Sequence, residues 1–321
     1  MRYRRFGRLG WQVAEIGYGM WGMGGWSGSD DEASLQALDR AVALGCNLFD
    51  TAYAYGEGRS ERLLRETLKR HPDRRLYVAT KVPPMDRVWP GKAETSISSV
   101  FPYTYIREMT EKSLANLGVD CIDLQQLHVW SDAWAEEDSW QRAASELKRD
   151  GLIRGFGISV NRWEPRNVVK ALQTGLVDAV QVVYNVFDQA PGEELFPVCE
   201  RLDVAVIARV PFDEGSLTGT MHEGVSWPAG DWRNLYFTPE HLREILPRVE
   251  RLKAVLPDGV PLPELALRFI LHHPAVSTII PGMRKVGHVE ANLAASDRGP
   301  LDPSLVAALG PYRWDRTYDI P

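Results

Sequence analysis

The chain has 321 residues, of which 44% are hydrophobic and 25% charged, as is typical of a folded globular protein. Its formal net charge is −6 and acidic and basic residues are mixed, so the sequence lacks the basic stripe of a nucleic-acid-binding protein. The N-terminus has no apolar run after its arginines, and no window approaches the ~18 apolar residues of a membrane helix. We therefore expect a cytoplasmic protein with neither a nucleic-acid nor a membrane partner.

The three cysteines, Cys46, Cys121 and Cys199, stand far apart in the sequence among apolar neighbours. Their spacing matches neither a zinc site nor a disulfide framework, so they are interpreted as small core residues and no metal site is expected. Reduced cysteines agree with the cytoplasmic location.

Eight short apolar runs, rich in β-branched residues, predict strands that are covered by helices. They span residues 14–19, 46–51, 76–81, 121–128, 153–159, 178–185, 204–209 and 276–280. Helical patterns separate the strands, and these span residues 31–45, 60–70, 104–118, 140–151, 164–175, 192–202 and 263–274. Eight alternating β/α units in about 300 residues are typical of an α/β fold, the closed (β/α)8 TIM barrel.

Four segments lie outside this alternation. The N-terminal segments YRRF and WQVA predict a β-hairpin that closes the bottom of the barrel. The insertions at 83–103 and 211–238 follow strand C-termini and predict long loops at the C-terminal, catalytic face. We expect one domain over residues 1–321, with a barrel core from about residue 3 to 296 and a C-terminal tail at 297–321.

The stretch GYGMWG at residues 17–22 matches the glycine pattern of a dinucleotide-binding Rossmann fold, in which Asp50 would bind a ribose. That pattern requires the third glycine to begin a helix, so that the helix N-terminus faces the pyrophosphate. Here further turn residues follow, and the next helical pattern begins only around Asp31. The sequence therefore favours the barrel.

Polar residues at strand C-termini converge on one mouth in such a barrel. Asp50 ends the second strand, Tyr55 follows in the next loop, and Lys81 and His128 end the third and fourth strands. A tyrosine with its ordinary pKa near 10 donates its proton poorly, and a neighbouring ammonium is expected to lower that pKa. Asp50 would keep Lys81 charged, and His128 would bind a substrate oxygen. Taken singly, Asp50 could cap a turn and His128 could be a core residue. Together with Tyr55 and Lys81, they favour a group that transfers a proton.

Six motifs together resemble the aldo-keto reductase superfamily. They are FDTAYAYGEGRSE at 49–61, VATK at 78–81, DLQQLH at 123–128, GFGIS at 155–159, QVVYN at 181–185 and IIPGMR at 279–284. They stand in the family's order, and the resemblance runs from residue 3 to about 296. It implies that Tyr55 is the general acid, helped by Asp50, Lys81 and His128, and that a nicotinamide across the barrel mouth supplies a hydride.

The resemblance also implies a set of contacts to NADPH. These fall on Gly19, Met20, Trp21, Asp50, Ser159, Asn161, Gln181, Arg209, Phe212, Leu217, Gly219, Gly282, Arg284, His288 and Asn292. Ser159 and Gln181 match the residues that bind the carboxamide. Val160 stands where the family usually has an asparagine, and Asn161 follows one position later. Arg209 replaces an aromatic that stacks under the nicotinamide; its guanidinium could stack too, or bind a substrate carboxylate.

Two further regions of the cofactor site follow from the resemblance. The loop at 214–219 resembles the segment that folds over the pyrophosphate. Arg284 stands where the family often binds the 2′-phosphate of NADP, which predicts NADPH rather than NADH as the cofactor.

The substrate site is expected to contain Trp21, Tyr53, Trp89 and Trp130, because aromatic walls favour apolar, aromatic or sugar-like carbonyl compounds. The leading hypothesis is an NADPH-dependent reductase of aldehydes or ketones. The alternatives are a nicotinamide-binding sensor subunit, a redox-neutral epimerase with tightly bound NADP, and a lyase that uses Lys81 as a Schiff base. The sequence leaves open the substrate, the reaction direction and whether the chain forms a homo-oligomer.

Overall fold

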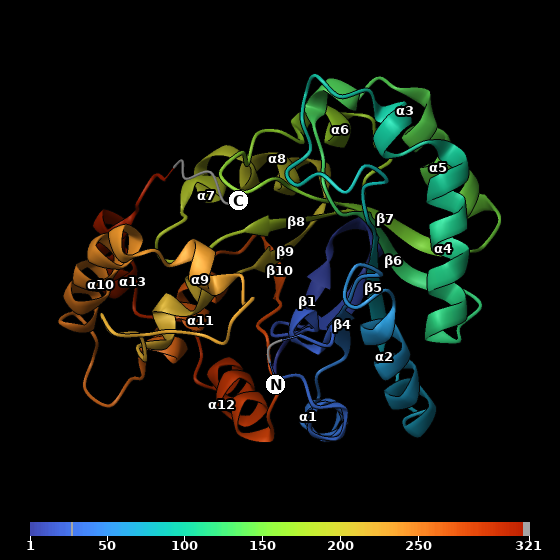
Figure 1. The fold of residues 1–321 in the computed structure, drawn as a ribbon. Coiled ribbons are helices and arrows are strands. Elements are labelled where there is room, and N and C mark those ends of the chain that lie inside the picture. Colours follow the sequence, from blue (N-terminus) through green and yellow to red (C-terminus); the bar gives the residue numbers. More distant parts are fainter. Residues whose placement is uncertain (27, 317–321) are drawn as a thin grey trace.

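The computed structural model describes residues 1–26 and 28–316 and contains the predicted barrel (Figure 1). Its eight parallel strands are β3 (Tyr18–Gly19), β4 (Leu48–Asp50), β5 (Tyr77–Val82), β6 (Ile122–Leu127), β7 (Ile153–Ser159), β8 (Ala179–Val183), β9 (Ala205–Arg209) and β10 (Val276–Ile279). Neighbours in sequence are neighbours in the sheet, from β3 to β10. Two isolated parallel bridges, Ile16 to Ile279 and Gly19 to Gly282, join its two edges into a nearly closed barrel. The predicted fold class is thus confirmed.

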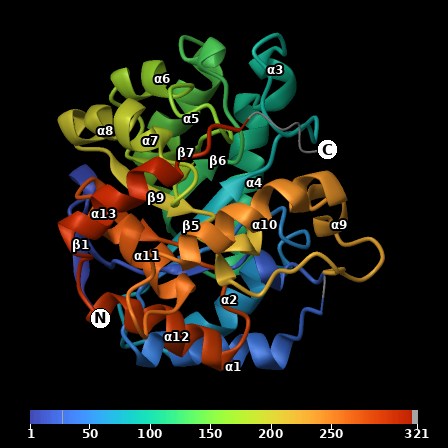
Figure 2. The ribbon, with the colours of Figure 1, turned by 90° about the vertical axis from the view of Figure 1, so that its left-hand side faces the viewer.

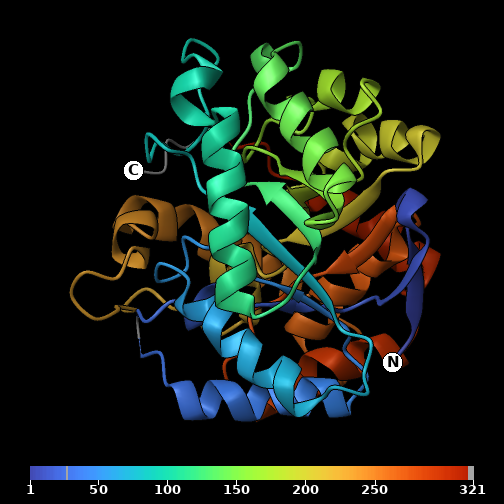
Figure 3. The same cartoon turned by 90° about the vertical axis from the view of Figure 1, so that its right-hand side faces the viewer.

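Helices cover the outside of the barrel, as the sequence predicts (Figure 3). Those that fall on the predicted helical patterns are α1 (Asp31–Ala43), α2 (Arg59–Arg70), α4 (Tyr103–Leu117), α5 (Asp138–Arg149), α6 (Val169–Gln173), α7 (Ala190–Glu194), α8 (Phe196–Leu202) and α11 (Leu262–His272), and α12 (Val286–Asp297) follows β10. The prediction of one helix over 192–202 was wrong, because the segment divides at Leu195 into α7 and α8. Pro197 lies in the first turn of α8, a position that suits the start of a helix but not its interior.

Further helices, which the sequence analysis did not predict, lie in the insertions, directly after the second insertion and in the tail. These are α3 (Ile97–Val100), α9 (Arg233–Tyr236), α10 (Pro239–Lys253) and α13 (Pro303–Leu309). The start of α10 carries a clear signal, since Thr238 caps the backbone N–H of His241 at 3.2 Å and Pro239 begins the helix. Figure 2 shows α10, α11 and α13 side by side on one face of the molecule.

The N-terminal hairpin consists of β1 (Tyr3–Phe6) and β2 (Trp11–Ala14), and it closes the barrel bottom as expected. Phe6 and Val13 pack on the apolar residues that point into the barrel there. We call these residues the lower layer: Leu48, Ala79, Leu124, Ala179, Ala205, Ile207 and Ile280. The hairpin therefore covers the end of the barrel opposite to the mouth.

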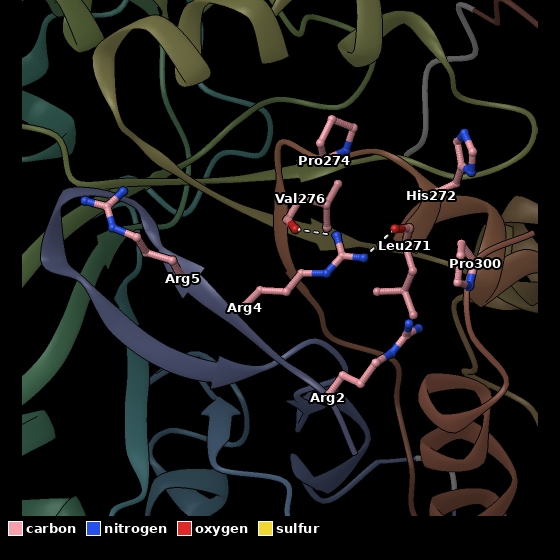
Figure 4. Close-up of a pocket in the computed structure, with 8 residues that line it drawn as sticks. All are labelled: Arg2, Arg4, Arg5, Leu271, His272, Pro274, Val276 and Pro300. Carbon is pink, nitrogen blue, oxygen red and sulfur yellow. Dashed lines mark hydrogen bonds between the residues drawn. The ribbon is translucent and has the colours of Figure 1, made fainter.

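A cavity of about 500 Å³ beside this hairpin is lined by Arg2, Arg4, Arg5, Leu271, His272, Pro274, Val276 and Pro300 (Figure 4). Arg4 donates hydrogen bonds to the backbone carbonyls of Val276, at 2.9 Å, and of Leu271 near the end of α11. Glu15 forms ion pairs with both Arg2 and Arg4 at 3.0 Å. These arginines are already paired, so we assign them to fastening the hairpin.

Candidate active site

A polar layer lies directly above the lower layer inside the barrel. Side chains of a strand alternate between its two faces, so residues two apart point the same way. Two positions beyond Leu48, Ala79, Leu124, Ala179 and Ile207 stand the residues that we call the upper layer: Asp50, Lys81, Gln126, Gln181 and Arg209. All of them except the half-buried Arg209 are at most 2% exposed.

Asp50 is the centre of the upper layer. Its Oδ1 accepts a hydrogen bond from Lys81 Nζ at 2.5 Å, and its Oδ2 accepts bonds from Gln126 Nε2 at 3.1 Å and Gln181 Nε2 at 2.8 Å. Lys81 Nζ also donates to the carbonyl of Thr51 at 2.8 Å. Because both oxygens of the carboxylate are satisfied, the buried ion pair has a fixed geometry.

The loop after β4 brings Tyr55 over this ion pair. Lys81 Nζ lies 5.1 Å from the centre of the Tyr55 ring, and the ring centre of His128 lies 5.8 Å from that of Tyr55. The tight path of the loop depends on Gly56, whose φ is +69°. A Cβ at this position would stand 2.2 Å from the carbonyl oxygen of Gly24, so only glycine fits. The structure thus brings together Asp50 and the three other residues predicted for proton transfer.

The protonation states of this group follow from burial and from neighbouring charges. Burial raises the pKa of Tyr55 and outweighs the opposing effect of Lys81, so the expectation of a lowered tyrosine pKa was wrong. Burial would lower the pKa of Lys81, but the charges and hydrogen bonds of Asp50 and Tyr55 together raise it. The pKa of His128 lies well below its ordinary value because of burial and the charges of Lys81 and Arg209. At neutral pH the site therefore holds a protonated phenol, an ammonium and a neutral imidazole.

The sequence analysis missed Gln126, although it lies on β6 two residues before His128, on the same face. Strand alternation is the signal that could have identified it. Its side chain has room because residue 157 of the neighbouring strand is glycine. A Cβ on Gly157 would stand 2.9 Å from Gln126 Cγ and 3.1 Å from the carbonyl oxygen of Ala179.

Tryptophans stand around the mouth. Trp21 and Trp89 are 43% and 46% exposed, and the ring of Trp89 lies 5.8 Å from that of His128. Trp26 was not predicted, yet its ring lies 6.3 Å from Tyr55 and 5.1 Å from Trp21. Its position in the glycine-rich turn after a strand end was the available signal.

The other aromatic residues predicted for the substrate site differ in exposure. Tyr53 is half-buried and packs against the main hydrophobic core. Trp130 is fully buried, packs edge-on against Trp134 and Trp140, and donates to Asp132 Oδ1 at 3.0 Å. The assignment of Trp130 to the substrate site was therefore wrong, because its side chain belongs to the core.

The residues predicted to bind the carboxamide lie together, since Ser159 and Gln181 are partners in the register of β7 and β8. Asn161 donates its amide to the carbonyl of Gly91 at 3.0 Å and to Glu164 Oε2 at 3.0 Å, so these donors are engaged within the loops. Arg209 Nη2 donates to the carbonyl of Val160 at 3.1 Å. Burial, and next the charge of Arg162, lower the pKa of Arg209 to about 10.

The remaining predicted cofactor positions lie at the C-terminal ends of β3, β9 and β10, in the loops that follow them and in α12. Gly19 and Gly282 face each other across the closing bridge, and a Cβ on Gly19 would stand 2.5 Å from the carbonyl oxygen of Ile280. Arg284 is half-buried and packs over Gly22, where a Cβ would meet its Cδ at 2.7 Å. Met20 and Leu217 are fully buried, Phe212 and Gly219 half-buried, His288 exposed and Asn292 7% exposed.

Three buried side-chain nitrogens at the mouth are open to a ligand. Nε of Arg162, Nε of Arg209 and Nδ1 of His128 are buried and have no hydrogen-bond partner within residues 1–26 and 28–316. Arg162 was not predicted; its Nη2 pairs with Glu214 Oε1 at 2.8 Å, which links the loops after β7 and β9. Guanidinium groups suit phosphate oxygens, so the residues present fit a nicotinamide dinucleotide.

Two further features are missing from the part of the chain that the structure describes. No group of three His, Cys, Asp or Glu side chains there could hold a metal ion. None of the helices described is long and apolar enough to cross a membrane. Cys46, Cys121 and Cys199 are free; Cys46 and Cys199 are buried core residues, whereas Cys121 is only partly buried.

Comparison with known proteins agrees with this geometry. The sequence model of the aldo/keto reductase family matches residues 15–310, and the chain belongs to that family of oxidoreductases. Among curated proteins, the chain is 30% identical to the uncharacterized oxidoreductase YqkF of Bacillus subtilis, over 96% of this chain and 95% of that one. It is 28% identical to an NADH-specific methylglyoxal reductase of Escherichia coli, over 88% and 90% of the two chains. A solved aldo-keto reductase from Bacillus halodurans, in its holo form, aligns with a TM-score of 0.79 at 27% identity over 99% and 98%.

Proposed function

We propose that the protein is an NADPH-dependent reductase that converts aldehydes or ketones to alcohols, with Tyr55 as the general acid. The observation that supports this most directly is the buried Asp50–Lys81 ion pair beneath the Tyr55 ring. An ammonium fixed in this place stabilises the phenolate that remains after proton donation. Without it, a buried phenol would hold its proton too firmly to serve a developing alkoxide.

Each residue of the group has a distinct part in this proposal. Tyr55, whose pKa is raised, enters the reaction fully protonated. It donates its proton to the carbonyl oxygen as the C=O double bond of the substrate becomes a single bond. His128, neutral at physiological pH, donates a hydrogen bond to the same oxygen and orients it. Asp50 keeps Lys81 charged and in position, and Gln126 and Gln181 hold Asp50. The protein thus gives one proton to the substrate. Tyr55 then takes up a proton from solvent.

The bound nicotinamide would supply the hydride to the carbonyl carbon. Ser159 and Gln181 would hold its carboxamide, and Arg209 would lie against the ring. The loop that contains Leu217 and Gly219 would cover the pyrophosphate, and Arg284 would bind the adenosine end. We further propose that residues 1–321 act as one domain, because the N-terminal hairpin closes the barrel bottom and the backbone N–H of Trp314 in the tail donates to Phe187 at 2.9 Å.

Substrates would be small carbonyl compounds with an apolar, aromatic or sugar-like body. Support comes from the aromatic side chains of Trp21, Trp26 and Trp89, which surround Tyr55 and His128. The Schiff-base lyase is disfavoured, because a nucleophilic lysine must be neutral and the pKa of Lys81 is raised.

Titration of the purified protein with NADPH and with NADH, followed by cofactor fluorescence, tests the proposal. We expect a saturable increase in NADPH fluorescence and its oxidation when aromatic or sugar-like aldehydes are added. A protein that binds neither nucleotide is not a reductase of this kind.

The preference for NADPH is tested by Arg284→Ala. A charged hydrogen bond to phosphate contributes about 1.5–3 kcal/mol, so we expect the Kd of NADPH to rise about 10- to 100-fold while that of NADH changes little. Arg298→Ala, at the C-terminal end of α12, is the matched control and should leave both values unchanged. Because a relative at 28% identity is NADH-specific, this measurement has to be made on the chain itself. Equal weakening of both nucleotides would remove the phosphate role of Arg284.

A further inference from the structure

The loop after β9 has an unusual backbone. Three residues in it that are not glycine have positive φ: Val210 at +55°, Asp213 at +47° and Glu214 at +57°. Such angles are rare for residues with side chains, and for a β-branched valine they are a genuine outlier. Strained conformations persist only where surrounding contacts impose them. The shape of this loop is therefore set by its neighbours and not by its own sequence.

The C-terminal tail supplies the strongest of these contacts. Arg316 Nη2 lies 2.6 Å from Asp213 Oδ1 and 2.7 Å from Asp188 Oδ2. Arg316 is 4% exposed and Asp213 fully buried, and the other oxygen of Asp213 accepts a hydrogen bond from Ser216 Oγ at 2.6 Å. One guanidinium thus joins the tail to the loops after β8 and β9.

Hydrogen bonds connect the same contact to Val210, another position with positive φ. Asp188 Oδ2 accepts a hydrogen bond from Asn185 Nδ2 at 2.9 Å, and that nitrogen also donates to the carbonyl of Val210 at 3.0 Å. Asn185 Oδ1 in turn accepts from the backbone N–H of Asp188 at 3.0 Å. Arg316 therefore contacts Asp213 directly and is connected to Val210 through Asp188 and Asn185.

Because they are buried, the two carboxylates depend on the positive charge of Arg316. Burial would raise the pKa of Asp213, but the charge and hydrogen bond of Arg316, together with Ser216 and Arg162, lower it. Two carboxylates that share one guanidinium would repel each other inside the protein if the guanidinium were lost. The tail itself is held by Trp314, whose ring centre lies 4.0 Å from the guanidinium carbon of Arg248 and 4.5 Å from that of Arg316.

The opposite side of the loop is held from within the barrel. Glu214, next to Asp213, forms an ion pair with Arg162 from the loop after β7. The side chains of Arg162 and Glu214 are 13% and 20% exposed, whereas the side chains of Arg316 and Asp213 are both 0% exposed. The bridge from the tail is therefore the more deeply buried of the two.

We propose that Arg316 is a positioning residue that latches the loop after β9 and thereby sets how fast a bound nicotinamide dinucleotide leaves. The proposal rests on the proposed function, in which this loop covers the pyrophosphate. It assigns to the tail a role in retaining the cofactor, distinct from the chemical step at Tyr55. Loops that cover a ligand commonly control its release, and changes of affinity appear mainly in the dissociation rate.

The test is the dissociation rate of NADPH, measured by stopped-flow displacement for the wild type and for Arg316→Met. Coupling energies between sites correspond to about 5- to 150-fold, and we expect the rate to increase within this range. The control is Arg313→Met, on the same tail, whose partners Glu193 and Asp315 are 74% and 70% exposed at their side chains. It should change the rate less than about twofold, because surface ion pairs contribute little.

A second variant separates the latch from a failure to fold. Arg316→Met combined with Asp188→Asn and Asp213→Asn removes both buried negative charges together with the guanidinium, and should fold even if the single variant does not. We expect it to release NADPH as fast as the single variant, whereas Arg316→Lys, which keeps the charge, should recover part of the slow release.

Hydrogen exchange of residues 210–219 in the cofactor-free protein provides a measurement independent of catalysis. We expect faster exchange there in the Arg316 variants and none of this change in Arg313→Met. If the wild type binds nucleotide but folded Arg316 variants release it at the wild-type rate, the role of Arg316 as a latch is refuted and the proposed function stands. If the wild type binds no nucleotide at all, the proposed function fails and the retention role fails with it.

Discussion

The lower and upper layers of the barrel occupy the same strands, two residues apart, yet differ completely in chemistry. Leu124 and Lys81 are each 1% exposed, one in the lower layer and one in the upper. The lower layer is apolar and packs on the hairpin. The upper layer holds a carboxylate, an ammonium and two amides in one hydrogen-bonded group. Burial alone therefore does not tell whether a barrel residue serves stability or chemistry.

The difference has a physical consequence for mutation. Apolar burial contributes roughly 25 cal/mol for each Å² removed from water, and a smaller side chain loses part of this gain and leaves a cavity. A buried ion pair contributes little net stability while it is intact, but the loss of one partner leaves an uncompensated charge. Changes in the lower layer should thus affect the fold, and changes in the upper layer should affect both fold and chemistry.

The largest effect is expected above the upper layer, for Tyr55→Phe. A general acid contributes about 10²- to 10⁴-fold, so kcat for carbonyl reduction should fall by at least 10². The Kd of NADPH should stay within about twofold, because the hydroxyl is directed at the substrate oxygen. Single-turnover rates and fluorescence titration measure the two quantities. Unchanged turnover would mean that the proton comes from another group.

Lys81→Met is expected to change both stability and rate. It leaves Asp50 buried without its cation, which typically costs about 3–5 kcal/mol in the free energy of unfolding. Combining it with Asp50→Asn should restore much of the stability, since the amide needs no counter-charge, but none of the activity. Urea denaturation and initial rates of the two variants check this. Recovery of activity in the double variant would contradict a catalytic role for the ion pair.

Much of this arrangement could be predicted from the sequence, and the reason is periodicity. Every strand of the barrel was located because each is a short apolar run between helical patterns. Asp50, Lys81 and His128 followed from their places at strand ends. The hairpin was also found, because YRRF and WQVA stand directly on either side of a short turn.

What escaped prediction depends on contacts between distant segments. Trp130 follows a strand end like a mouth residue, but its ring turns into a cluster with Trp134 and Trp140. The raised pKa of Tyr55 depends on how deeply the loop buries the phenol. Arg316 meets Asp213 across 103 positions of sequence, and no local pattern encodes such a pairing.

In the lower layer, Leu124→Ala should reduce stability and leave the chemistry intact. Replacing a buried leucine with alanine costs about 2–5 kcal/mol, depending on how far the surroundings close the cavity. The kcat of the molecules that remain folded should stay within about twofold of the wild type, since Gln126 and Asp50 keep their contacts. Denaturation curves and active-site titration with NADPH measure both. A large loss of kcat in folded protein would show that the two layers are coupled.

The smallest effect is expected from pH, and it concerns the protonation of Tyr55 and His128. The pKa of His128 lies well below its ordinary value, so lowering the pH through about 6.5 does not protonate it. The pKa of Tyr55 is raised, so the phenol keeps its proton up to at least about pH 10. Hence kcat for reduction, at saturating NADPH and substrate, should be flat between about pH 6 and pH 9. Saturation removes the titration of the 2′-phosphate near pH 6 from the profile. A tenfold change centred near pH 6.5 that disappears in His128→Asn would mean that His128 titrates in the working enzyme.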